Sequence, residues 1–304
     1  MKLTRKDFLR SSLILSGGIF LPVQKSWGRF LDEPKGFRTI GANTGIFSEK
    51  GGTIGWYISN DALVVIDSQY PDSAKNFMSG VRQKTDRKID IVFNTHHHGD
   101  HTSGNIYLKD FAVKIVAHEN CKMLQEKNDK KDPNNPQVYA DTTFSETWSQ
   151  DLGKEKVTAA YFGPAHTGGD SVIHFENENV AHVGDLVFNK TYPFIDSNGG
   201  GTIKNWPNVL NKIIARYSKE TKFIFGHSIS DDLLVGSADD LRNMANYLTA
   251  LHEFVASEIK KGKNKEEIAS APGVPGFIDL KERWNGAQKM NLEKAYDELS
   301  KEIK

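Results

Sequence analysis

The chain has 304 residues, of which 38% are hydrophobic and 26% charged, and its 39 Lys and Arg residues balance 39 Asp and Glu residues. This composition is that of an ordinary globular protein with enough chain for one large domain or two small ones. The zero net charge argues against electrostatic capture of nucleic acid, and the single cysteine, Cys121, excludes an intrachain disulfide or a metal cluster held by cysteines.

Residues 1–28 are predicted to form an export signal. Basic residues in "TRKDFLR" (4–10) precede the uncharged apolar run "SSLILSGGIFLPV" (11–23), which is too short to span a bilayer comfortably. The order of the basic residues resembles a twin-arginine signal in which Lys6 takes the place of the second arginine. We expect cleavage near residues 26–28, a periplasmic location and no stable membrane insertion after export.

Short runs rich in β-branched and aromatic residues predict strands. These runs lie at 53–59, 62–67, 89–95, 113–118, 156–162, 171–176, 180–184 and 222–226. The first two are separated by Asn60 and Asp61, a pair that predicts a hairpin turn. The charged segment 127–137, rich in Asn and Pro, is predicted to be a surface loop.

Apolar residues at helical spacing predict helices between and after these strands. One helix is predicted over residues 73–85, with Ser73 as a candidate N-cap, and another over 205–218. The C-terminal part of the chain reads almost entirely as helix, beginning with a long amphipathic helix over 238–262.

The order of these elements predicts the domain organisation. Strands that alternate with helices and are then followed by helices alone indicate a layered α/β domain with a C-terminal helical extension. We place the domain at residues 36–236 and the extension at residues 237–304. No internal repeat or low-complexity block stands out.

The octapeptide "NTHHHGDH" (94–101) contains four histidines and an aspartate. Residues two apart in an extended segment point the same way, so His96 and His98 are expected to share one side. Asp100 and His101 follow a flexible glycine and can turn toward a second position. Metal binding needs neutral imidazoles that converge on one point, so the remaining ligands must come from distant segments.

Three more candidate ligands lie at the ends of hydrophobic runs beside glycine or proline: His166, Asp185 and His227. Strand ends that run into loops are where rigid scaffolds place functional side chains. The predicted ligand sets are His96, His98 and His166 for one metal and Asp100, His101 and His227 for the other, with Asp185 able to bridge them. Nitrogen and oxygen ligands of this kind suit two Zn²⁺ ions, with Fe or Mn as alternatives. His97 is predicted to face away from the metals.

Several short motifs together resemble the metallo-β-lactamase-fold hydrolases. They are the H-x-H-x-D-H pattern of residues 96–101, "AHTGGDSV" around His166, "GDLVF" around Asp185 and "GH" at His227. Asp67, which closes "LVVID", matches the acidic residue that ends an early strand in this superfamily. The resemblance covers residues 37–230. It implies a four-layer αβ/βα sandwich, of mixed α/β (α+β) class, with the metals along one edge.

The charge of such a centre indicates a hydrolytic mechanism. Two Zn²⁺ ions would lower the pKa of a bound water to about 7 and leave residual positive charge to stabilise an oxyanion. Asp100 is the candidate for orienting this metal-bound hydroxide and relaying its proton. Asp67 is expected to hold the histidine loop in place from behind, and His182, three residues before Asp185, is the best candidate for a similar role.

The resemblance leaves several reactions open. A common subclass of β-lactamases carries a cysteine at the position of Asp185. The aspartate at this position makes the sequence similar to the glyoxalase-II and lactonase branches. The leading prediction is an exported dinuclear zinc hydrolase that acts on a small-molecule ester, thioester, lactone or amide. The alternatives are a β-lactamase-like amidase, a mononuclear iron persulfide oxygenase and a non-catalytic metal-binding protein.

Two local features each allow two interpretations. Asp170 either orients His166 or caps a turn. The Gly-rich segment "YPFIDSNGGG" (192–201) either faces the substrate or only connects two elements, and the resemblance places it near the metals. Cys121 is predicted to be an inert buried thiol.

Overall fold

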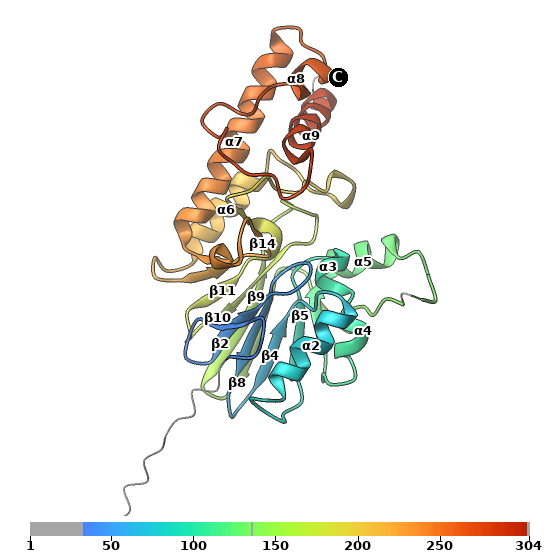
Figure 1. Cartoon of the computed structure of the whole chain (residues 1–304), viewed down its shortest axis with the longest axis vertical. Helices are drawn as coiled ribbons and strands as arrows, with labels where there is room; N and C mark the ends of the chain where they lie inside the picture. Colours follow the sequence, from blue (N-terminus) through green and yellow to red (C-terminus); the bar gives the residue numbers. More distant parts are fainter. Residues whose placement is uncertain (1–32, 135, 303–304) are drawn as a thin grey trace, which may run out of the picture. The chain divides into compact units, whose positions relative to one another are not determined.

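Residues 33–134 and 136–302 are described by a computed structural model of the chain, and they belong to one compact unit. The export signal predicted for residues 1–28 lies outside them. Two β-sheets lie at the centre of this unit, and helices cover their outer faces (Figure 1).

The first sheet has seven strands in chain order, from β1 at one edge to β7 at the other. They are β1 (Phe37–Thr39), β2 (Thr44–Phe47), β3 (Ile54–Ile58), β4 (Leu63–Ile66), β5 (Ile91–Asn94), β6 (Ile115–His118) and β7 (Thr142–Phe144). Strands β1 to β4 pair antiparallel, and β4 to β7 pair parallel. The hairpin predicted at Asn60 and Asp61 is confirmed, because β3 and β4 pair antiparallel on either side of that turn.

The second sheet has six strands in the order β15-β13-β11-β10-β9-β8. They are β8 (Thr147–Leu152), β9 (Glu155–Tyr161), β10 (Ser171–Phe175), β11 (Val180–His182), β13 (Lys222–Ile224) and β15 (Val235–Gly236). A separate short ladder pairs β12 (Phe188–Asn189) with β14 (His227–Ser228) in parallel. Strands β7 and β8 are among those that were not predicted, because their residues carry no continuous apolar run and several of them are exposed.

A buried apolar layer joins the two sheets face to face. It includes Tyr57, Val64 and Phe93 from the first sheet and Val157 and Phe175 from the second. The rings of Tyr57 and Phe175 stack with centroids 5.3 Å apart. Because every residue of β4 and β5 is buried, the first sheet must also be covered on its other face.

Helices provide that cover on both sides. They are α2 (Pro71–Val81), α3 (Gly99–Thr102), α4 (Asn105–Leu108), α5 (Glu119–Asn128), α6 (Trp206–Arg216), α7 (Ala238–Lys260), α8 (Lys265–Ala269) and α9 (Ala287–Glu302). Phe77 of α2 and Leu108 of α4 pack in a cluster with the first sheet, and Leu210 of α6 and Leu248 of α7 pack in a cluster with the second. The order helix, sheet, sheet, helix confirms the four-layer αβ/βα sandwich predicted from the sequence.

The helix predicted over residues 73–85 is present as α2, but it starts at a different residue. Helix α2 begins at Pro71 with Tyr70 as its N-cap, two residues before Ser73. Proline suits the first helical position because its missing N–H needs no partner there. The prediction of Ser73 as the N-cap is therefore wrong. Its hydroxyl, at the third helical position, accepts a hydrogen bond from the Tyr70 backbone N–H at 3.2 Å.

The C-terminal extension shares a hydrophobic core with the second sheet. Leu248 of α7 and Leu292 of α9 belong to the same buried cluster as Phe223 of β13 and Val183, which follows β11. The division at residues 236/237 stays a prediction. None of the helices in the described part of the chain is both long and apolar enough to cross a membrane.

Removal of the Leu248 side chain tests this shared core. Leu248 is fully buried, and a Leu→Ala change at such a site costs about 2–5 kcal/mol through lost burial and a residual cavity. We expect Leu248→Ala to lower the free energy of unfolding by that amount in a urea titration followed by circular dichroism. Asn246→Ala, at an exposed position of the same helix, is the control and should change it by less than about 0.5 kcal/mol. Unfolding of the extension ahead of the sheets would contradict the shared core.

Candidate metal centre

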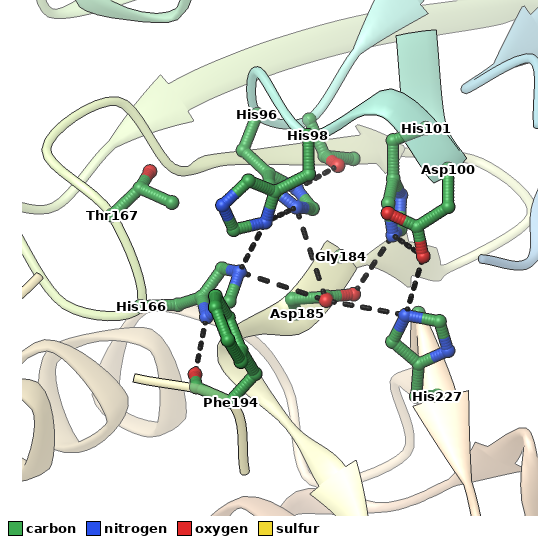
Figure 2. A network of polar contacts seen from close by, with 12 residues as sticks. His96, His98, Asp100, His101, His166, Thr167, Gly184, Asp185, Phe194 and His227 are labelled. Carbon is green, nitrogen blue, oxygen red and sulfur yellow. Dashed lines mark hydrogen bonds and ion pairs between the residues drawn. The ribbon is translucent and has the colours of Figure 1, made fainter. Parts of the chain in front are cut away.

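All seven predicted metal ligands come together in one place (Figure 2). Their positions are the loop after β5 (His96, His98), α3 (Asp100, His101), the β9–β10 loop (His166), the 3₁₀ turn after β11 (Asp185) and the first residue of β14 (His227). Each position is in a strand or in the loop, turn or short helix that follows one. The sheets therefore fix the backbone from which these side chains extend.

Three histidines form the first group of ligands. The Nδ1 atom of His98 lies 3.1 Å from the Nε2 atom of His96 and 3.1 Å from the Nε2 atom of His166. His96 and His166 are buried, whereas His98 is partly exposed. Three ring nitrogens from two distant segments thus face one point, which is how three protein side chains surround a catalytic metal.

Asp100, His101 and His227 form the second group. The Nε2 atom of His227 lies 3.0 Å from Oδ2 of Asp100, and the Nε2 atom of His101 lies 3.7 Å from the same oxygen. The two histidines are buried, but the Asp100 side chain is 24% exposed. This group therefore opens toward solvent through its carboxylate.

The Asp185 carboxylate lies between the two groups. Its Oδ1 atom is 3.1 Å from His101 Nε2, and its Oδ2 atom is 3.3 Å from His227 Nε2 and 3.6 Å from His166 Nε2. The structure thus divides the seven residues as the sequence analysis does, with three on each side of Asp185. Metal binding by these residues stays a prediction.

The buried Asp67 carboxylate fixes two of the histidines from behind. It accepts hydrogen bonds from the backbone N–H and the hydroxyl of Thr95, both at 2.8 Å, and from Nδ1 of His101 at 2.7 Å. Because the Thr95 hydroxyl donates its proton to Asp67, its oxygen accepts a hydrogen bond from Nδ1 of His96, 3.0 Å away. Asp67 therefore holds His101 directly and His96 through Thr95.

The segment 192–201 fixes the other two histidines of the first group, His98 and His166. The Nδ1 atom of His166 donates to the Phe194 carbonyl oxygen at 2.8 Å, and the Nε2 atom of His98 donates to the Asp196 carboxylate at 3.1 Å. The sequence leaves the role of this segment open, and Asp196 is not among the residues predicted for the site. The only sequence signal for Asp196 is its place in a Gly-rich segment that the family resemblance puts near the metals.

The inner nitrogens of the first group carry lone pairs that face one another. His96, His98 and His166 each donate a ring proton outward, so the nitrogens that meet in the centre are all acceptors. Burial lowers the pKa of His96 well below its usual value and that of His166 to about 3, which keeps both rings neutral. Facing lone pairs of neutral imidazoles repel one another unless a cation lies between them, so this group fits a divalent metal ion.

The second group is dominated by its carboxylates. Burial opposes a charge on His101, but Asp185, Asp100 and Asp67 raise its pKa well above the usual value. Burial also opposes a charge on Asp100, yet His101 and His227 lower its pKa to about 2. His101 Nε2 and Asp185 Oδ1 are buried 3.1 Å apart, and neither has another hydrogen-bond partner among the described residues. A buried imidazole nitrogen and a carboxylate oxygen with no partner besides each other also fit a cation.

His182 supports the turn that carries Asp185. Its Nδ1 atom accepts a hydrogen bond from the Gly184 backbone N–H at 3.1 Å, and its Nε2 atom donates to the Thr53 carbonyl oxygen at 3.1 Å. Gly184 has a φ of +52°, and a Cβ there would lie 2.7 Å from the Thr95 hydroxyl oxygen. The turn thus requires glycine, and His182 acts on Asp185 through the backbone.

Two neighbouring residues lie outside the ligand groups. Asp170 accepts hydrogen bonds from the backbone N–H and the hydroxyl of Thr167, at 2.8 and 2.6 Å. Of the two roles left open by the sequence, it therefore caps the turn after His166 and does not orient the ring, whose Nδ1 atom is bonded elsewhere. His97 has its Nε2 atom 3.4 Å from the Asp196 carboxylate and belongs to neither group of ligands around Asp185.

A cavity of about 630 Å³ opens onto the centre. Its lining includes four of the predicted ligands and residues from distant segments: His98, Asp100, Asp185, His227, Gly51, Tyr70, Gly99, Phe188, Phe194, Arg283 and Trp284. A cavity walled by aromatic side chains, with polar groups gathered at one point, is typical of a small-molecule site. Arg283 and Trp284 come from the C-terminal extension, which the sequence analysis did not assign to the site.

Comparison with known proteins agrees with this geometry. Residues 50–246 match the sequence model of a family described as the metallo-beta-lactamase superfamily. The chain is 22% identical over 173 residues to a metallo-beta-lactamase type 2 of Elizabethkingia meningoseptica, which covers 57% of this chain and 67% of that protein. It is 24% identical over 249 residues to a hydroxyacylglutathione hydrolase of Dictyostelium discoideum, covering 80% and 83% of the two proteins. A solved sec-alkyl sulfatase structure has the same fold over 87% of this chain and 50% of its own, with a TM-score of 0.71 and 16% identity.

Replacement of Asp67 by Asn tests how far the buried carboxylate holds the ligands. Asn has the same shape and tolerates the φ of +63° at this position, but it lacks the charge and turns an amide donor toward His101 or Thr95. We expect the zinc affinity, measured by competition with a chromophoric chelator, to fall about 10- to 100-fold. Asp86→Asn, which changes an exposed carboxylate, is the control and should leave the affinity unaltered. An unaltered affinity in Asp67→Asn would mean that the ligands are held without this carboxylate.

Proposed function

The chain belongs to the metallo-beta-lactamase superfamily and is a metal-dependent hydrolase, and we propose that it is an exported enzyme that uses two zinc ions to hydrolyse a small ester, thioester, lactone or amide. The family match supports the hydrolase class. Export is supported by the basic and apolar residues of segment 1–28. The two zinc ions are supported by the geometry of the ligand groups.

The observation that carries this proposal is the position of Asp185 between two groups of three candidate ligands. Three protein ligands per metal leave a coordination position for water or substrate, as catalytic sites require. All seven donors are nitrogen or oxygen atoms, a set that suits zinc, with iron or manganese as alternatives. Two complete groups favour a dinuclear centre over a mononuclear iron oxygenase, and over a non-catalytic metal-binding protein.

When bound, two divalent cations would supply a Lewis acid for a carbonyl group and lower the pKa of water to about 7. The chain's own residues would position the reactants. The Asp100 side chain is 24% exposed, against 4% for Asp185, so Asp100 is the carboxylate that can orient a water molecule in the cavity and accept its proton. Phe188 and Phe194 line the cavity beside it and would exclude bulk water from the reacting bond.

The names of the relatives support an acyl substrate. The hydroxyacylglutathione hydrolase matches 80% of this chain, and the metallo-beta-lactamase type 2 matches 57%. The longer match favours an ester or thioester as the substrate. A β-lactam amide is the second candidate.

Elemental analysis tests the dinuclear centre. We expect the purified chain to hold about two zinc ions in inductively coupled plasma mass spectrometry, because each group offers three ligands. His227→Ala removes a ligand from the second group only and should reduce the content to about one zinc ion. His252→Ala, which changes a partly buried histidine of α7, is the control and should leave it at about two. One iron and no zinc in the purified protein would overturn the proposal and favour the oxygenase.

The variant Asp100→Ala tests the proposed catalytic carboxylate. We expect kcat on an aryl acetate to fall at least about 100-fold, because Asp100 is the more exposed of the two carboxylates that line the cavity. The melting temperature should change little, since Asp100 is partly exposed and belongs to none of the apolar clusters. The metal content of the same sample separates loss of proton transfer from loss of metal, and Asp110→Ala, an exposed carboxylate, is the control. Full activity in Asp100→Ala would mean that the nucleophile is oriented elsewhere.

A further inference from the structure

The C-terminal extension contributes to the wall of the cavity that contains the metal centre. Arg283 and Trp284 lie in the segment between α8 and α9, and both line the same cavity as His98, Asp100 and Asp185. Side chains of a distant segment thus face the place where a substrate would meet the metal ligands. They lie outside the part of the chain that the family model matches.

Contacts on both sides of Arg283 fix the position of this segment. Just before it, the Lys281 carbonyl oxygen accepts hydrogen bonds from the Thr191 hydroxyl at 2.7 Å and from the Tyr192 backbone N–H at 3.4 Å. The Glu282 carboxylate accepts hydrogen bonds from two backbone N–H groups at the start of α9, at 3.2 and 3.0 Å. Arg283 therefore extends from a backbone that is anchored to the rest of the site.

Aromatic rings connect this segment with the predicted ligands. The Trp284 ring lies 6.5 Å from the Phe194 ring, and the Phe194 ring lies 5.6 Å from the ring of His98. On the other side, Phe188 stacks on His227 at 5.3 Å. An apolar wall therefore extends from the metal centre to the C-terminal segment, and it suits an apolar part of a ligand.

Arg283 is the cationic residue of this cavity. None of its other lining residues is a lysine or an arginine. Arg283 is exposed and has no ion pair or hydrogen bond with any of the described residues, and its neighbour Glu282 is already bonded to the start of α9. A guanidinium group stays charged at every physiological pH, and its planar fork of donors fits two oxygen atoms of an oxyanion.

We propose that Arg283 binds an oxyanionic group of the substrate, a carboxylate, sulfate or phosphate, at the end remote from the scissile bond. Trp284 and Phe194 bind the apolar part that lies between this group and the metal centre. The substrate is therefore an amphipathic anion, and Arg283 determines specificity for its charge. This inference rests on the proposed hydrolytic function for the identity of the reacting end, but it concerns binding at the opposite end.

A binding measurement tests the inference without turnover. Isothermal titration calorimetry compares 2-naphthalenesulfonate with the neutral 2-(methylsulfonyl)naphthalene on the protein as purified. We expect the anion to bind about fivefold more tightly at low salt, the upper range for an exposed ion pair, and this preference to shrink as the ionic strength rises. In Arg283→Gln the preference should fall to near one, and Arg283→Lys should keep part of it because the charge remains.

A kinetic measurement tests whether Arg283 also favours an anionic substrate that is hydrolysed. Hydrolysis of 4-acetoxybenzoate and 4-acetoxybenzenesulfonate is compared with that of the neutral 4-acetoxybenzamide. We expect Arg283→Gln to lower the anion-to-neutral ratio of kcat/KM about fivefold, mainly through KM, because the contact is made in the ground state and the transition state alike. A larger decrease for 4-acetoxybenzoate indicates a carboxylate in the substrate, and a larger decrease for 4-acetoxybenzenesulfonate indicates a sulfate-like group.

Lys289→Gln is the matched control. It removes one positive charge from an exposed position of α9 that does not line the cavity, and it should preserve both preferences. Equal preference for the anion in Arg283→Gln and in the unaltered protein, or no preference in the unaltered protein, would overturn the inference. Anion-selective binding that depends on Arg283, without hydrolysis of any of the three acetates, would support the inference and count against the proposed function.

Discussion

At the end of β4 the carboxylate of Asp67 is completely buried, and a charge in such a place is tolerated only when its oxygens are hydrogen-bonded. Its partners are the Thr95 backbone, the Thr95 hydroxyl and His101, and all of them belong to the segment that follows β5. The need to satisfy this one carboxylate therefore fixes the histidine loop against the neighbouring strand. It also determines that Nδ1 of His101 and of His96 carries a proton and faces away from Asp185, so that Nε2 of each ring is directed toward Asp185.

The C-terminal helices fix the segment 192–201, and this segment orients the rings of His98 and His166. Asn291 of α9 is fully buried, donates to the Pro193 carbonyl oxygen at 2.8 Å and accepts from the Tyr247 hydroxyl of α7 at 2.9 Å. Glu298 of α9 holds the chain just after the segment 192–201 through backbone N–H groups at 2.9 and 3.0 Å. The extension is thus joined to the backbone that orients two of the predicted metal ligands, and the same helices position the outer wall of the cavity. The predicted metal site and the cavity therefore depend on one packed unit.

The seven candidate ligands could be predicted from the sequence because their signals are local: histidines at fixed spacing, or a polar residue at the end of an apolar run. Asp196 and Arg283 could not be predicted in this way. Asp196 contacts His98 across 98 positions of the chain, and nothing near either residue indicates that contact. Both positions result from the packing of the extension on the site, which no local pattern encodes. The N-cap assigned to Ser73 was wrong for a local reason, since Pro71 is the stronger signal for the start of the helix.

The central claim is that two cations lie on either side of Asp185, each held by one of the two groups of side chains. Anomalous diffraction at the zinc absorption edge, from crystals of the purified protein, tests this claim most directly. We expect two peaks roughly 3.5–4 Å apart, the usual separation in two-metal sites. One should lie among His96, His98 and His166 and the other among Asp100, His101 and His227. A single peak, or peaks held by other residues, would contradict the claim.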